Sequence, residues 1–361
     1  MKDPVAARSN DDDDLYDIAS WEPRTALDRL AVNTYYSVLH AGRWFLVLVA
    51  VFILLLIAAS GLGATITDNP FIIGLVALSV VPAGLLAVYI YIADITTSEP
   101  LTLLVATFVL AILFAGFAAI INSVFGFLRL LPFFGLVLFF FLVVGPVEEA
   151  VKLLAVRLYA YRDDRFDSVI DGAVYGAVAG LGFATIENAL YITQNIQGPG
   201  MILAQMGVDV GNQLLETIDA GGEITAVRGL AGPGHVIYSA FAGYDLGLAK
   251  FNPDNAGPIV AKGLLIAAFI HALYNTLVSI VPVLAFLVVP GVPILLLFFG
   301  FVVVYQGLFG YILYRKLQRY RTRYKRVHET APSPSLTPER TEFDPETSQQ
   351  NFSETSQRDD R

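Results

Sequence analysis

The sequence contains no cysteine, and charged residues make up only 15% of its 361 residues. The absence of cysteine excludes disulfide bonds, thiolate-bound metal centres and a cysteine nucleophile, so any chemistry must use oxygen and nitrogen groups. Soluble globular chains carry about a quarter charged residues. The scarcity of charge, together with 55% hydrophobic residues and a mean hydropathy of +0.62, therefore excludes an ordinary soluble protein.

The net charge of −9 is concentrated near the two ends, where it includes four consecutive aspartates at 11–14. This pattern indicates solvated tails and argues against a nucleic-acid partner. Residues 1–43 are expected to form a cytoplasmic tail, in which a modest amphipathic piece over 26–36 is either an interfacial helix or disordered. Residues 315–361 are expected to form a second cytoplasmic tail, first basic and then too poor in apolar residues to fold alone.

Long apolar segments are what the chain has in abundance. A helix of about 20 apolar residues crosses the hydrocarbon layer of a membrane. Segments near that length are predicted at 44–62, 71–94, 101–125, 132–160, 168–195, 229–249, 258–281 and 290–314. We therefore predict an all-α polytopic protein with a bundle of about eight transmembrane helices over 44–314, in contact with the lipid bilayer.

The distribution of lysine and arginine predicts the orientation of this bundle. Short cytoplasmic loops retain positive charge. With eight spans, most basic residues fall on the side of both tails: Arg29, Arg43, Arg157, Arg162, Arg165, Lys250, Lys262 and the cluster over 315–326. The sequence thus predicts a multi-pass protein of the cell membrane with both termini in the cytoplasm.

Ionisable residues inside the apolar segments are the first functional candidates, because a charge at mid-bilayer costs roughly 3 kcal/mol on insertion scales. The fourth segment contains Glu148, Glu149 and Lys152 shortly after Pro146. One interpretation is a helix start with an internal ion pair. The other is a proton-transfer site, since two carboxylates in apolar surroundings repel each other and favour holding a proton.

Three further segments contribute polar residues at comparable depth. His271 and Asn275 lie one helical turn apart and share a face, although a histidine bonded to a neighbouring carbonyl is the usual structural alternative. Glu187 has no basic residue nearby in sequence, so another helix or a metal must meet its charge, and His235 is a candidate. Two imidazoles and carboxylates form a minimal set for hydrolysis, and Asn275 can stabilise an oxyanion.

The pattern formed by Glu148-Glu149-x-x-Lys152, Phe183-x-x-x-Glu187, an intramembrane His235 and His271-x-x-x-Asn275 resembles the PrsW family of intramembrane proteases over residues of about 130–280. This family is related to the CAAX prenyl proteases and bacteriocin-processing enzymes, whose pattern has histidine where this chain has Glu187.

The resemblance implies catalytic roles for all seven residues: Glu148, Glu149, Lys152, Glu187, His235, His271 and Asn275. Glu148 or Glu149 would activate water, and His271 with Asn275 would stabilise the transition state or bind a metal. The resemblance leaves two mechanisms open. One uses a divalent metal such as zinc on Glu187, His235 and His271, and the other uses glutamate without metal.

The expected substrate is a transmembrane or membrane-adjacent protein, cut in regulated proteolysis. The main alternative is a proton- or ion-coupled transporter, since intramembrane Glu, His and Lys also form proton relays, although no inverted repeat supports it. A non-catalytic scaffold would require a broken motif, and the motif is intact. The sequence carries no signal for an oligomeric state.

Overall fold

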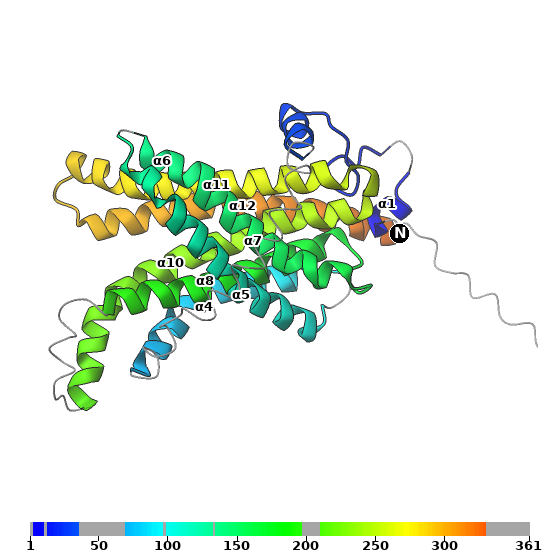
Figure 1. Ribbon diagram of the computed structural model, residues 1–361. Coiled ribbons are helices and arrows are strands. Elements are labelled where there is room, and N and C mark those ends of the chain that lie inside the picture. Colours follow the sequence, from blue (N-terminus) through cyan, green and yellow to red (C-terminus); the bar gives the residue numbers. More distant parts are fainter. Residues whose placement is uncertain are drawn as a thin grey trace, which may run out of the picture.

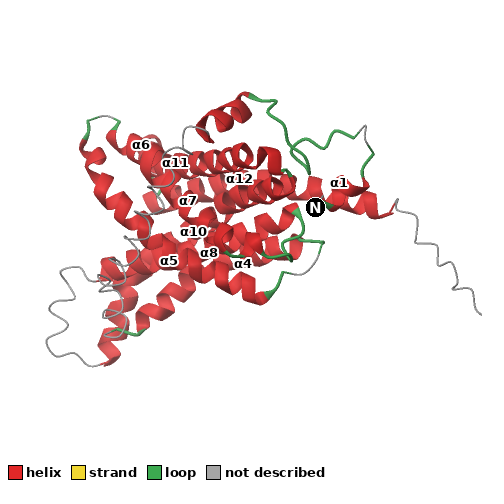
Figure 2. Cartoon of the chain, turned by 45° about the vertical axis from the view of Figure 1, so that its right-hand side comes forward, coloured by secondary structure: helices red, strands yellow, loops and turns green. Residues whose placement is uncertain are grey.

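The computed structural model describes residues 3–10, 13–35, 69–96, 99–132, 134–196 and 210–329, with the side chains of 210–220 and 328–329 left out. Within these ranges the regular elements are all helices, and no strand is present (Figure 2). The predicted all-α class is confirmed. The predicted span at 44–62 and the acidic end of the chain after 329 lie outside the described residues.

The helices follow the apolar segments of the sequence. In chain order they are α1 (Pro4–Arg8), α4 (Phe71–Ala93), α5 (Leu101–Val124), α6 (Gly135–Phe139), α7 (Gly145–Leu158), α8 (Val169–Ile196), α10 (Val210–Phe251), α11 (Ala256–Val288) and α12 (Ile294–Glu329). Residues 26–35 are also helical, within the predicted amphipathic piece. Short 3₁₀ segments lie at Phe125–Leu130, Ala160–Arg162 and Pro253–Asn255.

Five of the described helical stretches are long and apolar enough to cross a membrane. They are Phe71–Ala93, Leu101–Leu130, Val169–Ile196, Pro253–Val288 and Ile294–Val327. Large apolar side chains on their outer faces are exposed, for example Leu85 at 66% and Val304 at 73%, as expected for surfaces that face lipid. The chain is thus a multi-pass membrane protein.

Two predicted segments differ in shape from the expectation. The segment 132–160 is divided into α6, a π-helical turn at Phe140–Val144 and α7. The stretch 196–228, a connection between the predicted segments 168–195 and 229–249, is helical from residue 210, so α10 extends 42 residues through Phe251. The hydropathy of the sequence does not predict this extension, because residues 210–228 are too polar for a membrane span.

Helices α8 and α10 lie side by side with their backbones in direct contact (Figure 1). A Cβ atom added at Gly176 would lie 2.2 Å from the carbonyl oxygen of Ser239, and one at Gly180 would lie 2.3 Å from that of His235. Glycines spaced four residues apart on α8 therefore pack against α10, because small residues let the backbones of membrane helices approach closely. This contact fixes the height of His235 relative to Glu187.

Helix α7 approaches α11 in the same way. A Cβ atom at Gly145 would lie 2.5 Å from the carbonyl oxygen of Ala268. Gly145 follows the π-helical turn directly, and Pro146 occupies the first turn of α7, where a missing N–H is tolerated. The glycine contact places the start of α7 against the middle of α11.

The amino-terminal segment packs on the ends of the long helices. Asp3 accepts a hydrogen bond from the Tyr320 hydroxyl at 2.7 Å. Asp17, whose φ of 58° is in the left-handed region, pairs with Lys262 of α11 at 2.6 Å and with Lys316 of α12 at 3.0 Å. Residues 3–10 and 13–35 thereby contact the part of the bundle where the sequence of α12 becomes basic (Figure 1).

Candidate active site

The first turns of α7 supply two carboxylates and an ammonium group. Glu148, Glu149 and Lys152 are all buried, with Glu149 and Lys152 fully inaccessible. Lys152 Nζ lies 2.7 Å from Glu149 Oε1 and 4.0 Å from Glu148 Oε2. The two glutamates are therefore not equivalent, because Lys152 compensates Glu149 much more closely than Glu148.

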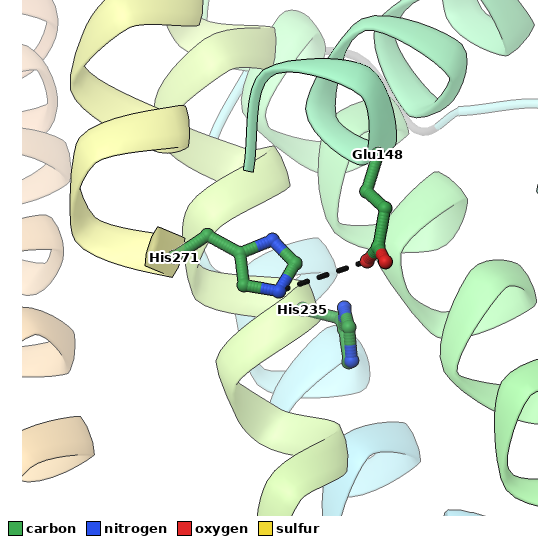
Figure 3. Close-up of side chains that lie close together, drawn as sticks. All are labelled: Glu148, His235 and His271. Carbon is green, nitrogen blue, oxygen red and sulfur yellow. Dashed lines mark ion pairs between the residues drawn. The ribbon is translucent and has the colours of Figure 1, made fainter. Parts of the chain in front are cut away.

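His271 of α11 faces both glutamates. Its Nδ1 lies 2.9 Å from Glu149 Oε1, and its Nε2 lies 3.6 Å from Glu148 Oε2 (Figure 3). An ionised carboxylate only accepts hydrogen bonds, so Nδ1 carries the hydrogen and donates it to Glu149. In the neutral imidazole, the Nε2 lone pair then faces Glu148.

His235 of α10 adopts the opposite tautomer. Lys152 Nζ lies 2.9 Å from His235 Nδ1, and an ammonium group can only donate, so Nδ1 accepts. His235 Nε2 then carries the hydrogen and donates it to Glu187 Oε2 at 2.8 Å. Arg228, also on α10, donates to the same oxygen of Glu187. The charge of Glu187 is thus met by two groups from another helix.

These groups surround a cavity of about 560 Å³. Five of the seven predicted site residues line it: Glu148, Glu187, His235, His271 and Asn275. Glu149 and Lys152 lie behind them and are connected to the cavity through the two histidines. The structure therefore brings all seven predicted residues to one place, from helices α7, α8, α10 and α11.

The arrangement also suits a metal ion. Glu148, His235 and His271 each offer one ligand atom, and these atoms lie within 4.8 Å of one another. Two imidazoles and a carboxylate form a ligand set typical of zinc, and Glu148 Oε2 is buried without a hydrogen-bond partner. The sequence had favoured Glu187 in place of Glu148, whereas Glu187 is engaged by Arg228 and His235. Both ring nitrogens of His235 are bonded, one to Lys152 and one to Glu187, so His235 would have to give up one of these hydrogen bonds to bind the ion.

Two residues of this site were not found by sequence reasoning. Asn122 of α5 donates through Nδ2 to Glu148 Oε1 at 3.1 Å, and its own Oδ1 is buried without a partner. Arg228 was assigned to a loop, but it lies in α10 against Glu187. The available signal for Asn122 was its carboxamide in an otherwise apolar segment.

Replacing Asn122 by alanine should reduce the rate of peptide cleavage about ten-fold. The change removes the hydrogen bond that orients Glu148, and a bond to a charged group contributes roughly 1.5 kcal/mol. Cleavage of a reporter peptide by purified protein measures the effect. Thr185→Ala is the matched control, because its hydroxyl donates to the Leu181 carbonyl within α8. Equal rates in both variants would contradict a positioning role for Asn122.

The fold and the site together define a class: a multi-pass helical membrane protein with a buried carboxylate–imidazole centre among its helices, as a membrane-embedded hydrolase requires. A sequence model described as the PrsW family intramembrane metalloprotease matches residues 99–306. The chain belongs to this family. The matched region contains all seven predicted site residues and Asn122.

Individual relatives support the same assignment. The chain is 26% identical over 207 residues to Protease PrsW of Shouchella clausii, covering 57% of this chain and 84% of the relative. It is 28% identical to Protease PrsW of Geobacillus kaustophilus, covering 56% and 79%, and 26% identical to that of Bacillus subtilis, covering 57% and 83%. No solved structure matches. The resemblance and the peptidase class are confirmed, and a transporter is not favoured.

Proposed function

We propose that this chain hydrolyses peptide bonds of membrane-embedded or membrane-adjacent proteins with a water molecule activated by Glu148. One observation carries the proposal. Glu148 Oε2 is buried in the cavity wall without a hydrogen-bond partner, 3.6 Å from the free lone pair of His271 Nε2. A water molecule bound at this point has a carboxylate within reach to take its proton.

The remaining residues hold these two groups in place. Glu149 accepts from His271 Nδ1, which directs Nε2 toward Glu148, and Lys152 neutralises Glu149 from 2.7 Å. A carboxylate behind a histidine fixes its tautomer and ring orientation, as in many hydrolytic sites. The geometry thus supports Glu148 as the proton acceptor and Glu149 as the residue that positions His271.

Asn275 and the pair of His235 and Glu187 complete the proposed site. Asn275 lies one turn beyond His271 on α11 and lines the same cavity, where its carboxamide can donate to a developing oxyanion. His235 is held as a neutral donor between Lys152 and Glu187. Glu148, His235 and His271 are also the residues that would hold a divalent ion such as zinc. Bound there, the ion would polarise the substrate carbonyl or the water.

We further propose a bundle of eight spans with both tails in the cytoplasm. Five of these spans are the apolar helices, and the other three are 44–62, α6 together with α7, and α10. α7 has only 14 residues and contains Glu148, Glu149 and Lys152 of the proposed site, whereas α10 is rich in glycine and polar residues, so neither has both the length and the hydropathy of a usual span. The substrate is a transmembrane protein, cut in regulated proteolysis as the PrsW resemblance implies.

Cleavage of a panel of single-span reporter peptides in liposomes tests the function. We expect cleavage by the wild-type protein. Loss of cleavage with a zinc chelator and recovery on adding zinc would assign a metal to Glu148, His235 and His271 and would make Glu148 a ligand instead of the proton acceptor. Cleavage that persists under chelation would support the glutamate mechanism without metal. Proton flux in the same liposomes, without cleavage of any reporter, would contradict the proposal in favour of a transporter.

A further inference from the structure

A second group of carboxylates, two of them buried and one half-buried, lies away from the cavity, where α4, α5 and α8 meet. Asp94 follows the last residue of α4, Glu99 precedes α5, and Asp171 is in the first turn of α8. One oxygen of each lies within 4.8 Å of the others. Asp171 and Glu187 are roughly 24 Å apart along α8 at 1.5 Å per residue, so this cluster is separate from the proposed active site.

Two oxygens of the cluster are buried and lack a partner. Tyr175 donates to Glu99 Oε2, but Glu99 Oε1 has no hydrogen bond although the residue is only 4% exposed. Thr96 donates to Asp94 Oδ1 at 2.7 Å, and Asp94 Oδ2 is likewise unpaired. Two of the three carboxylates therefore each have an oxygen that accepts no hydrogen bond from a donor group.

Within the part of the chain that the structure describes, the cluster also lacks a close cationic partner, although Lys250 interacts with Asp171 at longer range. Among the described residues, no lysine or arginine forms an ion pair with Asp94, Glu99 or Asp171. Buried carboxylates in proteins are paired with a cation, coordinate a metal or hold a proton.

We propose that Asp94, Glu99 and Asp171 bind one divalent cation of the hard, oxygen-preferring type, Ca²⁺ or Mg²⁺. The available donors are carboxylate and hydroxyl oxygens, with no imidazole among them, which disfavours zinc. The two unpaired oxygens are the atoms free to become ligands. Because the three residues come from three helix ends, the bound cation holds α4, α5 and α8 together.

Thermal unfolding of the full chain in detergent tests this site in the His271→Ala background, which removes a ligand from the proposed active-site metal. After chelation, Ca²⁺, Mg²⁺ and Mn²⁺ are titrated separately, and bound Mn²⁺ is counted by electron paramagnetic resonance. We expect about one Mn²⁺ per chain and a rise in Tm of roughly 5 °C at saturation with the preferred cation. Comparison of the Ca²⁺ and Mg²⁺ titrations identifies that cation.

Glu99→Gln decides between a cation and a shared proton. If a cation binds, the variant loses the rise in Tm and the bound Mn²⁺, while Asp164→Asn, a control at an exposed carboxylate before α8, keeps both. If the cluster only holds a proton, Glu99→Gln is at least as stable as the parent, because the amide replaces a protonated acid. A Tm insensitive to all three cations, or an equal rise in Glu99→Gln, would overturn the proposal.

Discussion

Glu148→Gln should reduce peptide cleavage by roughly 10²- to 10⁴-fold, the contribution typical of a positioned proton acceptor. Glutamine keeps the shape of the side chain and can still accept the Asn122 hydrogen bond of 3.1 Å. It cannot take a proton from water beside His271. Single-turnover cleavage of a reporter peptide measures the chemical step directly, and the main loss should appear there rather than in substrate binding.

The matched control for this variant is Glu22→Gln, which removes an exposed glutamate paired with Arg24 in the amino-terminal segment. It should cleave at the wild-type rate. Glu148→Gln should unfold at a temperature at least as high as the wild type, because the substitution removes an incompletely compensated buried charge. Normal turnover in Glu148→Gln would exclude Glu148 as the proton acceptor and would direct attention to Glu149.

Gly180→Ala should destabilise the protein by several kcal/mol and eliminate most of its activity. The new Cβ would lie 2.3 Å from the His235 carbonyl oxygen, a backbone atom that cannot rotate away, so α8 and α10 must separate. Separation displaces His235 from Glu187. Overpacking of this kind costs about 1–3 kcal/mol in soluble cores and more where backbones touch. The melting temperature in detergent and the yield of monodisperse protein report the effect.

Gly84→Ala in α4 provides the contrast, because no atom lies within 4 Å of its added Cβ. Alanine is the better helix former by about 1 kcal/mol, so this variant should be as stable as the wild type or slightly more stable. If Gly180→Ala were equally harmless, the close contact between α8 and α10 would not be present in the protein.

The positions of the apolar helices could be predicted from the sequence. The predicted segment 71–94 became Phe71–Ala93, and 168–195 became Val169–Ile196. Long apolar runs bounded by proline or aspartate define such helices without tertiary information. The polar residues of the site could be listed for a related reason, since each charged residue in a span is costly and therefore informative.

The pairing of these residues could not be predicted in the same way. The sequence left the roles of Glu148 and Glu149 open. Which of the two glutamates lies closer to His271 depends on the rotation of α7 against α11, and no local pattern encodes that rotation. Arg228 was misplaced because residues 196–228 lack the hydropathy of a span, although part of this stretch is helical. Likewise, the ion pairs of Asp17 join residues more than 200 positions apart, which no local pattern encodes.

The hydrogen-bonded chain from Arg228 to His271 has an electrostatic consequence. With neutral histidines, its two cations offset Glu149 and Glu187, and Glu148 alone remains as a formal negative charge. In a low-dielectric interior an uncompensated charge is costly. In the proposed mechanism, transfer of a proton from water to Glu148 would make the protein part of the site electroneutral when negative charge forms on the substrate. The arrangement of charges would therefore favour deprotonation of the water.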